Sequence, residues 1–260
     1  MKKILEKSGW RIEFLEEIDS TNQEAIRRAE QGEASGLVLV ADFQTRGRGR
    51  LGRTWSAKPK NSLLASVLLR PAIASEHLGL IPILSGVALA LSIEEIAGFK
   101  PGLIWPNDLF GKKGKMAGIL VESALEKGQL KFVVIGAGVN LAQTKEDFPL
   151  EIRPRASSIS EESGKIVSRD RILFVYLDHL GFWLKSLEKG EFSRIVEKYS
   201  EFDIIKGSQV RVLTGGDEMT GIASGIDLQG RLKLQSRGKK LSFSAGEITR
   251  IRGIKDAVSD

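Results

Sequence analysis

The sequence predicts an α/β fold: a mixed β-sheet with helices, followed by a small β barrel. Apolar runs at residues 37–41 (LVLVA) and 62–69 (SLLASVLL) have the length and composition of buried strands. Patterns of helical length cover residues 78–93 and 169–187. Towards the C-terminus the pattern changes to short alternating segments separated by glycine-containing turns. Strands mixed with helices, then strands alone, indicate a large α/β unit and a small β unit.

The first predicted elements are a strand at residues 11–15 and a helix that opens at residues 19–22 and runs to about Gln31. Ser20 or Thr21 is a suitable N-cap, because a hydroxyl oxygen can accept a hydrogen bond from the first turn of a helix. Glu24 stands where the partner of Thr21 in a capping box would stand. Capping alone is a sufficient explanation for these residue types at this position.

The middle of the chain predicts a buried helix over residues 78–93, ended by Gly98. Three further strands follow, at residues 103–105, 115–122 and 131–141, and residues 150–160 form a connection. Two amphipathic helices are predicted at residues 169–187 and 192–202. His179 shares a helical face with apolar residues, and we expect it in the core.

The last part of the chain predicts a barrel of about 50 residues. At 260 residues the chain has room for a large and a small domain, which we place at residues 1–205 and 206–260. The expected strands of the small domain are residues 209–213, 219–226, 232–235, 241–243 and 248–251.

The composition excludes several kinds of chemistry. The chain has no cysteine, which rules out a disulfide framework and a thiolate nucleophile, and its two histidines make a histidine-based metal cluster improbable. The net charge of +6 indicates only a mild preference for anionic partners. The N-terminus lacks a signal-peptide pattern, and the uncharged run at residues 78–93 is shorter than the roughly 20 residues that span a bilayer. We therefore expect a soluble cytoplasmic protein with no membrane contact.

The most informative stretch is residues 44–55 (QTRGRGRLGRTW), which we call the arginine loop. Glycine lets a backbone approach a ligand closely, and guanidinium matches the oxygens of phosphate and carboxylate groups. Arg46, Arg48 and Arg50 alternate, so an extended segment would direct all three the same way. Clustered cations repel one another unless an anion lies among them. The loop therefore predicts an anion-binding site for a nucleotide or an activated phosphate ester.

Three other interpretations compete for the arginine loop, and the simplest is a solvated basic loop that binds nothing. The spacing Gly47-x-Gly49-x-x-Gly52 matches a dinucleotide fingerprint, but that fingerprint must open a helix, and here the chain runs on towards a strand. A nucleic-acid-binding module would also use arginines on phosphates. Such a module predicts aromatic stacking partners, and only Phe43 and Trp55 are close.

Four motifs in order resemble those of the biotin–protein ligases. The arginine loop contains the signature-like GRGRLGRTW (residues 47–55), and Asp-Ser-Thr-Asn precedes it at residues 19–22. Trp-Pro-Asn-Asp at residues 105–108 is followed by KMAGIL at 115–120, and GAGVN lies at 136–140. The resemblance spans nearly the whole chain. It implies a class II synthetase-like catalytic domain followed by an SH3-like domain.

The same resemblance implies an activity. Biotin and ATP, with Mg²⁺, would give biotinyl-5′-AMP, and the biotinyl group would pass to a lysine of a biotin carboxyl carrier protein domain of acetyl-CoA carboxylase or a related carboxylase. The ligase would be monofunctional, without a DNA-binding domain, so we expect at most weak, salt-dependent binding to DNA. Whether the chain forms a homodimer stays open. A lipoate or octanoate ligase of the same superfamily is the alternative enzyme.

The resemblance also implies roles for individual residues. The catalytic residues would be Lys115 and Arg50, and Asp108 would help to hold Mg²⁺. The biotin-binding residues would be Ser20, Thr21, Asn22, Gln44, Gly47, Arg48, Lys115 and Gly118. The nucleotide-binding residues would be Arg48, Arg50, Arg53, Trp55, Asn107, Asp108 and Asn140.

Lys115 has a physical reason to lie at such a site. A lysine at the start of a strand is usually only solvated, but here two anions, the carboxylate and the α-phosphate, must meet. A cation between them offsets their repulsion and stabilises charge that grows on the phosphate oxygens. The chain departs from the family at Ile104, where a lysine usually precedes the tryptophan. We expect Lys112, Lys113 or Lys115 to supply the missing charge.

Overall fold

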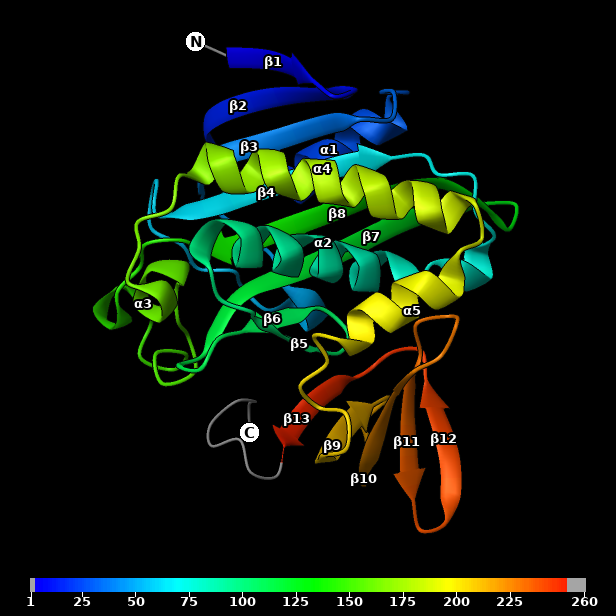
Figure 1. The fold of residues 1–260 in the computed structure, drawn as a ribbon. Coiled ribbons are helices and arrows are strands. Elements are labelled where there is room, and N and C mark those ends of the chain that lie inside the picture. Colours follow the sequence, from blue (N-terminus) through cyan, green and yellow to red (C-terminus); the bar gives the residue numbers. More distant parts are fainter. Residues whose placement is uncertain (1–2, 252–260) are drawn as a thin grey trace.

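The computed structural model describes residues 3–251, which form an eight-stranded sheet with helices and a five-stranded antiparallel sheet (Figure 1). The large sheet has the order β1-β2-β3-β4-β8-β7-β6-β5. Its strands are β1 (Lys3–Lys7), β2 (Trp10–Ile18), β3 (Leu37–Gln44), β4 (Ser62–Leu69), β5 (Gly102–Ile104), β6 (Asp108–Phe110), β7 (Lys115–Glu126) and β8 (Gln129–Asn140). The predicted mixed sheet with helices is confirmed.

Helices cover both faces of the large sheet. In Figure 1, α2 and α4 lie side by side in front of the sheet, and α1 lies behind it. Only β2 and β3 are parallel, because α1 connects them as a crossover, and the other neighbouring strands are antiparallel. The helices are α1 (Thr21–Glu30), α2 (Leu80–Ala97), α3 (Ile159–Ser163), α4 (Arg169–Glu188) and α5 (Phe192–Ser200).

Helix α2 forms the centre of the core. It is apolar on nearly every side, as expected for a helix that packs on the sheet and is flanked by α4 and α5. Gly98 ends it in the left-handed conformation with φ of 79°, as the sequence predicts. By length and composition α2 is apolar enough to cross a membrane, but 72% of this segment is buried inside the protein, as in a core helix.

The C-terminal sheet has the order β12-β11-β10-β9-β13 and lies below α5 in Figure 1. All five predicted strands are present, as β9 (Gln209–Thr214), β10 (Asp217–Ile226), β11 (Leu232–Ser236), β12 (Lys239–Phe243) and β13 (Glu247–Ile251). The turn between β10 and β11 rests on the large unit: the indole Nε1 of Trp105 donates to the Gly230 carbonyl at 2.9 Å. A side chain on Gly230 would collide with Gly79, so the two backbones lie in direct contact.

Two local expectations were wrong, one was met only in part, and two short strands were missed. His179 is not a core residue: its side chain is 30% exposed, and Nε2 lies 3.3 Å from the Glu95 carboxylate. Glu24 does not close a capping box but pairs with two arginines of its own helix. Ser20 is the N-cap residue of α1, as expected, but its side chain makes no capping hydrogen bond. The sequence interpretation also missed β1 and β6, which are short, and short strands give little periodic signal.

Candidate active site

A cavity of about 430 Å³ is lined by residues of the large sheet, the start of α1 and the arginine loop. It lies where the start of α1, the arginine loop and strands β7 and β8 meet. All the residues singled out from the sequence line it except Gly47, and these are Ser20, Thr21, Asn22, Gln44, Arg48, Arg50, Arg53, Trp55, Asn107, Asp108, Lys115, Gly118 and Asn140. The fold thus brings residues from four separate motifs into one cavity.

One end of the cavity is lined by small polar groups. The backbone nitrogen of Thr21 and its hydroxyl both donate to Oε1 of Gln44, at 2.7 and 3.0 Å. The Ser66 hydroxyl lies 2.7 Å from the Thr21 hydroxyl and 2.5 Å from Oδ1 of Asn22. Asn22 is 4% exposed, and its Nδ2 donates to a carboxylate oxygen of Glu122 at 3.0 Å. This end therefore presents oriented donors and acceptors on a rigid frame, as recognition of a small polar ring requires.

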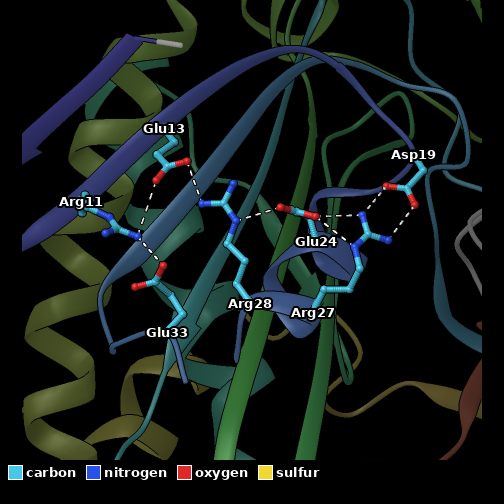
Figure 2. Close-up of polar contacts among 7 residues, drawn as sticks. All are labelled: Arg11, Glu13, Asp19, Glu24, Arg27, Arg28 and Glu33. Carbon is cyan, nitrogen blue, oxygen red and sulfur yellow. Dashed lines mark hydrogen bonds and ion pairs between the residues drawn. The ribbon is translucent and has the colours of Figure 1, made fainter. Parts of the chain in front are cut away.

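A chain of alternating charges holds the start of α1 in place (Figure 2). Arg27 donates to both carboxylate oxygens of Asp19, at 3.1 and 3.2 Å, and to Glu24 at 3.0 Å. Arg28 bridges Glu24 on α1 to Glu13 on β2, at 2.8 and 2.7 Å. Asp19 also accepts the Ser20 backbone N–H at 2.7 Å, so these ion pairs fix the turn that carries the polar end of the cavity.

These ion pairs make the free energy of unfolding depend on pH in the acid range. The hydrogen bonds from Arg27 lower the pKa of Asp19 below its ordinary 3.8. Burial raises the pKa of Glu24, but its hydrogen bonds to Arg28 and Arg27 outweigh this and leave it below 4.5. A lowered folded pKa stabilises the protein above the unfolded pKa, and this contribution is lost as the pH falls through the folded value.

We expect the free energy of unfolding to decrease as the pH is lowered below about 4.5. We expect Arg27→Gln to make this decrease with pH shallower. At pH 7 the variant should lose at most about 1 kcal/mol, because the pair with Asp19 is largely exposed. Urea unfolding of both proteins between pH 3 and pH 7 measures the difference. Parallel pH curves would show that Arg27 contributes nothing to the acid dependence.

The floor of the cavity is made by glycines on two neighbouring strands. Gly118 on β7 lies opposite Gly138 on β8 in the register, and the Trp55 indole lies on both. A Cβ on Gly138 would come within 2.5 Å of that indole, and one on Gly136 would come within 2.2 Å of the Asn22 side chain. The glycines are required because ring and amide lie directly on the backbone.

The arginine loop bends where an extended segment was expected. Leu51, between Arg50 and Gly52, takes a left-handed conformation with φ of 54°. Its side chain is 72% exposed. The loop continues into β4 and opens no α-helix, in agreement with the rejection of the dinucleotide fingerprint. Residues 45 and 46 lie in a turn, and Arg46 is exposed and does not line the cavity, so the expectation that an extended segment directs all three arginines the same way was wrong.

The remaining arginines of the loop each meet a partner. Nη1 of Arg48 donates to Glu122 at 2.9 Å. Nη1 of Arg50 donates to Oδ1 of Asn107 at 3.0 Å, and its Nη2 donates to the Gly246 carbonyl of the C-terminal sheet at 2.9 Å. Arg53 pairs with Glu247 of β13 through both of its terminal nitrogens. The guanidinium groups face into the cavity and its rim, which does not favour a nucleic-acid surface.

The other end of the cavity holds the charged groups expected at a nucleotide site. Nζ of Lys115 lies 2.8 Å from Oδ1 of Asp108 and 5.8 Å from the centre of the Trp55 ring. Burial lowers the pKa of Arg50, and the carboxylates of Asp108 and Glu247 oppose that shift. Arg50 stays charged at neutral pH, because a free guanidinium titrates above about 12.

Asn140 holds the backbone around Lys115. Its Nδ2 donates to the Ser157 carbonyl at 3.0 Å and to the Lys115 carbonyl at 3.5 Å. The buried Gln143 donates to Oδ1 of Asn140 at 3.2 Å and thereby fixes which way the amide points. The Lys115 backbone N–H also donates to the Arg155 carbonyl, at 2.6 Å. Lys115 is therefore positioned through its backbone as well as through Asp108.

Of the three lysines expected to compensate for Ile104, Lys115 lines the cavity and the other two do not. Ile104 is 3% exposed and packs in the core. Lys112 and Lys113 do not line the cavity: their backbone N–H groups donate to Glu162, and Nζ of Lys113 donates to the Glu161 carbonyl. Arg155 does line it. The expectation for Lys112 and Lys113 was wrong, because the Glu162 carboxylate holds their turn outside the cavity.

Sequence reasoning missed several other residues of the site. Ser66 and Glu122 lie beside Asn22, and the period-2 alternation of β7, which puts Gly118, Leu120 and Glu122 on one face, could have indicated Glu122. Gly246 and Glu247 come from the C-terminal sheet. Nothing local in the sequence shows that this sheet reaches the arginine loop.

Comparison with known proteins agrees with this geometry. The model of the biotin/lipoate A/B protein ligase family matches residues 14–140, and that of the biotin protein ligase C-terminal domain matches residues 205–250. A biotin–[acetyl-CoA-carboxylase] ligase of Mycobacterium tuberculosis is 34% identical over 94% of this chain and 91% of its own length. A biotin–[acetyl-CoA-carboxylase] ligase of Paracoccus denitrificans is 32% identical, and the match covers 90% of this chain and 98% of that protein.

A solved structure shows the same architecture. The biotin protein ligase from Aquifex aeolicus, in complex with biotin and ATP, has a TM-score of 0.79 and 31% identity. The match covers 92% of this chain and 97% of that one. Similarity of sequence and fold along nearly the entire length, together with a cavity built from the expected motifs, identifies the family. The chain belongs to the biotin protein ligases.

Proposed function

We propose that this protein activates biotin with ATP to give biotinyl-5′-AMP and pyrophosphate, and then transfers the biotinyl group to a lysine of a biotin carboxyl carrier domain. The observation that carries the proposal is the single cavity with two unlike ends. One end offers neutral donors and acceptors at Thr21, Asn22 and Gln44, and the other offers charges at Lys115 and Asp108. An uncharged ring linked to a carboxylate, followed by a nucleotide, matches this order of groups.

The proposed roles follow from chemistry at the charged end. The biotin carboxylate must attack the α-phosphorus, and Lys115 offsets the repulsion between the two anions. Arg48, Arg50 and Arg53 line the cavity from the arginine loop, and the Trp55 indole lies on Gly118 and Gly138 beside Lys115. The acceptor lysine then attacks the carbonyl of the mixed anhydride, and AMP leaves. No covalent enzyme intermediate is needed.

Asp108 is the proposed ligand of Mg²⁺. Within residues 3–251 no group of three or more histidine, aspartate or glutamate side chains could hold a metal ion. That fits an ion bound through one carboxylate together with substrate phosphates and water, as is usual for Mg²⁺ with nucleotides. The ion would neutralise charge on the phosphates. Residues 1–205 form the proposed catalytic domain and residues 206–260 the C-terminal domain, in a cytoplasmic enzyme.

Arg155 is the proposed substitute for the lysine that Ile104 replaces. We expect Arg155→Gln to raise KM for ATP roughly tenfold, because one charged contact to a phosphate is lost, and to leave KM for biotin nearly unchanged. Lys112→Gln is the matched control, since it removes a nearby charge outside the cavity. Initial rates against each substrate separate the two effects. Equal KM values for ATP in both variants would exclude Arg155 from the nucleotide site.

Transfer to a carrier tests the proposal as a whole. The protein is incubated with biotin, MgATP and a purified biotin carboxyl carrier domain, and the carrier mass is measured. We expect a gain of one biotinyl group on the wild-type carrier and none on a carrier whose acceptor lysine is replaced by arginine. Failure to modify the wild-type carrier, while adenylate forms, would show that the acceptor class is wrong.

A further inference from the structure

Glu122 links the polar end of the cavity to the arginine loop. It lies on β7, on the same face as Gly118 and Leu120, and its side chain is 24% exposed. Its two carboxylate oxygens serve different partners: Oε2 accepts from Nδ2 of Asn22 at 3.0 Å, and Oε1 accepts from Nη1 of Arg48 at 2.9 Å. Asn22 belongs to α1 and Arg48 to the loop, so a single carboxylate joins two otherwise separate parts of the site.

The contact with Asn22 sets the direction of its amide. A carboxylate can only accept, so the nitrogen of Asn22 must face Glu122, and Oδ1 then faces the Ser66 hydroxyl at 2.5 Å. The same nitrogen reaches the Leu120 carbonyl at 3.4 Å. Because Asn22 is 4% exposed and its amide lies directly against the Gly136 backbone, the amide has few other orientations.

The contact with Arg48 depends on the position of the loop. Arg48 is 42% exposed, and Glu122 is the carboxylate that holds its guanidinium over the cavity. If the loop moves away, the carboxylate keeps only the N–H of Asn22 as partner. Charge-assisted hydrogen bonds are the stronger ones, so both contacts favour the arrangement in which loop and amide are in place together.

We propose that Glu122 is a positioning residue that couples closure of the arginine loop to the orientation of Asn22, and so to the retention of biotin. The inference rests on the proposed binding of biotin at the polar end. Coupling of this kind is reciprocal: biotin favours the closed loop by the same factor by which the closed loop favours biotin. Glu122 touches neither reacting group, so its effect should appear in biotin affinity and not in nucleotide affinity.

The test uses Glu122→Gln, which keeps the size of the side chain. A glutamine offers one acceptor and one donor group, so it can satisfy Asn22 or Arg48 but not both. Glu126→Gln is the matched control, since Glu126 lies on the same strand and pairs only loosely with Lys131, at 3.8 Å. Arg48→Gln reaches the same link from its exposed side, so it gives a second variant if Glu122→Gln does not fold.

Calorimetry measures the Kd of biotin without ATP and, separately, the Kd of ATP. We expect Glu122→Gln to weaken biotin binding roughly tenfold and ATP binding less than about twofold, with Glu126→Gln unchanged. Combined with Arg48→Gln, the loss should be smaller than the sum of the single losses. Unchanged biotin affinity, equal weakening of both ligands, or strict additivity would each overturn the inference. Binding without adenylate formation would instead count against the proposed function.

Discussion

Replacing Lys115 by glutamine is expected to slow adenylate formation by roughly a hundred- to a thousandfold. The change keeps the length of the side chain and some hydrogen bonding but removes the charge that faces Asp108 at 2.8 Å. One preorganised donor aimed at developing charge is typically worth about 3–4 kcal/mol in the transition state. The stability of the fold should change little, because the Nζ group is partly exposed and the backbone of Lys115 is held independently by Asn140 and Arg155.

The two half-reactions should respond differently to Lys115→Gln. Attack of a lysine on pre-formed biotinyl-adenylate brings no second anion to the phosphate, so transfer should suffer less than adenylation. Single-turnover measurement of each half-reaction separates these effects. Lys113→Gln is a suitable control, because its Nζ donates to the Glu161 carbonyl outside the cavity. Adenylation within a few-fold of wild type in Lys115→Gln would place the catalytic cation elsewhere.

Replacing Arg50 by glycine is expected to let biotinyl-adenylate escape roughly ten- to a hundredfold faster, while its formation stays measurable. Arg50 joins three parts of the protein: the arginine loop, Asn107 on the nucleotide side, and the Gly246 carbonyl of the C-terminal sheet. Each hydrogen bond to a charged group is worth about 1.5–3 kcal/mol, so loss of one of the two alone corresponds to the expected roughly ten- to hundredfold change. A loop freed from these contacts should open more often.

Arg46→Gly is the matched control for Arg50→Gly. It adds the same backbone freedom to the same loop, but Arg46 is exposed and lies outside the cavity lining. Escape is measured by trapping released adenylate after a single turnover. If both variants lose adenylate equally fast, flexibility of the loop explains the effect. If neither differs from wild type, Arg50 does not retain the intermediate.

The parts of the fold that sequence could predict are those with strong periodicity. The buried strands β3 and β4, the apolar helix α2 ended by Gly98, and the five short strands of the C-terminal sheet all follow from local pattern and turn residues. Of the two strands of three residues, β5 was predicted to within one residue, whereas β6 carries too little pattern and was missed. His179 was wrongly predicted to be buried, because helical spacing alone does not show which residues at the edge of the buried face remain exposed to solvent.

The site shows a similar division. Motifs singled out from the sequence line the cavity, with Gly47 as the exception, because each motif sits at the end of a strand or the start of a helix that faces it. The partners of those residues were not predictable. Glu122 pairs with Arg48, which is 74 residues away in the sequence, and Glu247 pairs with Arg53, which is 194 residues away. Such pairings depend on how sheets and loops pack, which no local pattern contains.

Biotin-dependent exchange of labelled pyrophosphate into ATP tests the central claim most directly. The exchange requires the reversible formation of an acyl-adenylate, so it reports whether this cavity activates biotin, without a carrier protein. We predict rapid exchange with biotin and MgATP, and none above background when lipoate or octanoate replaces biotin. Exchange that is driven by lipoate and not by biotin would contradict the account.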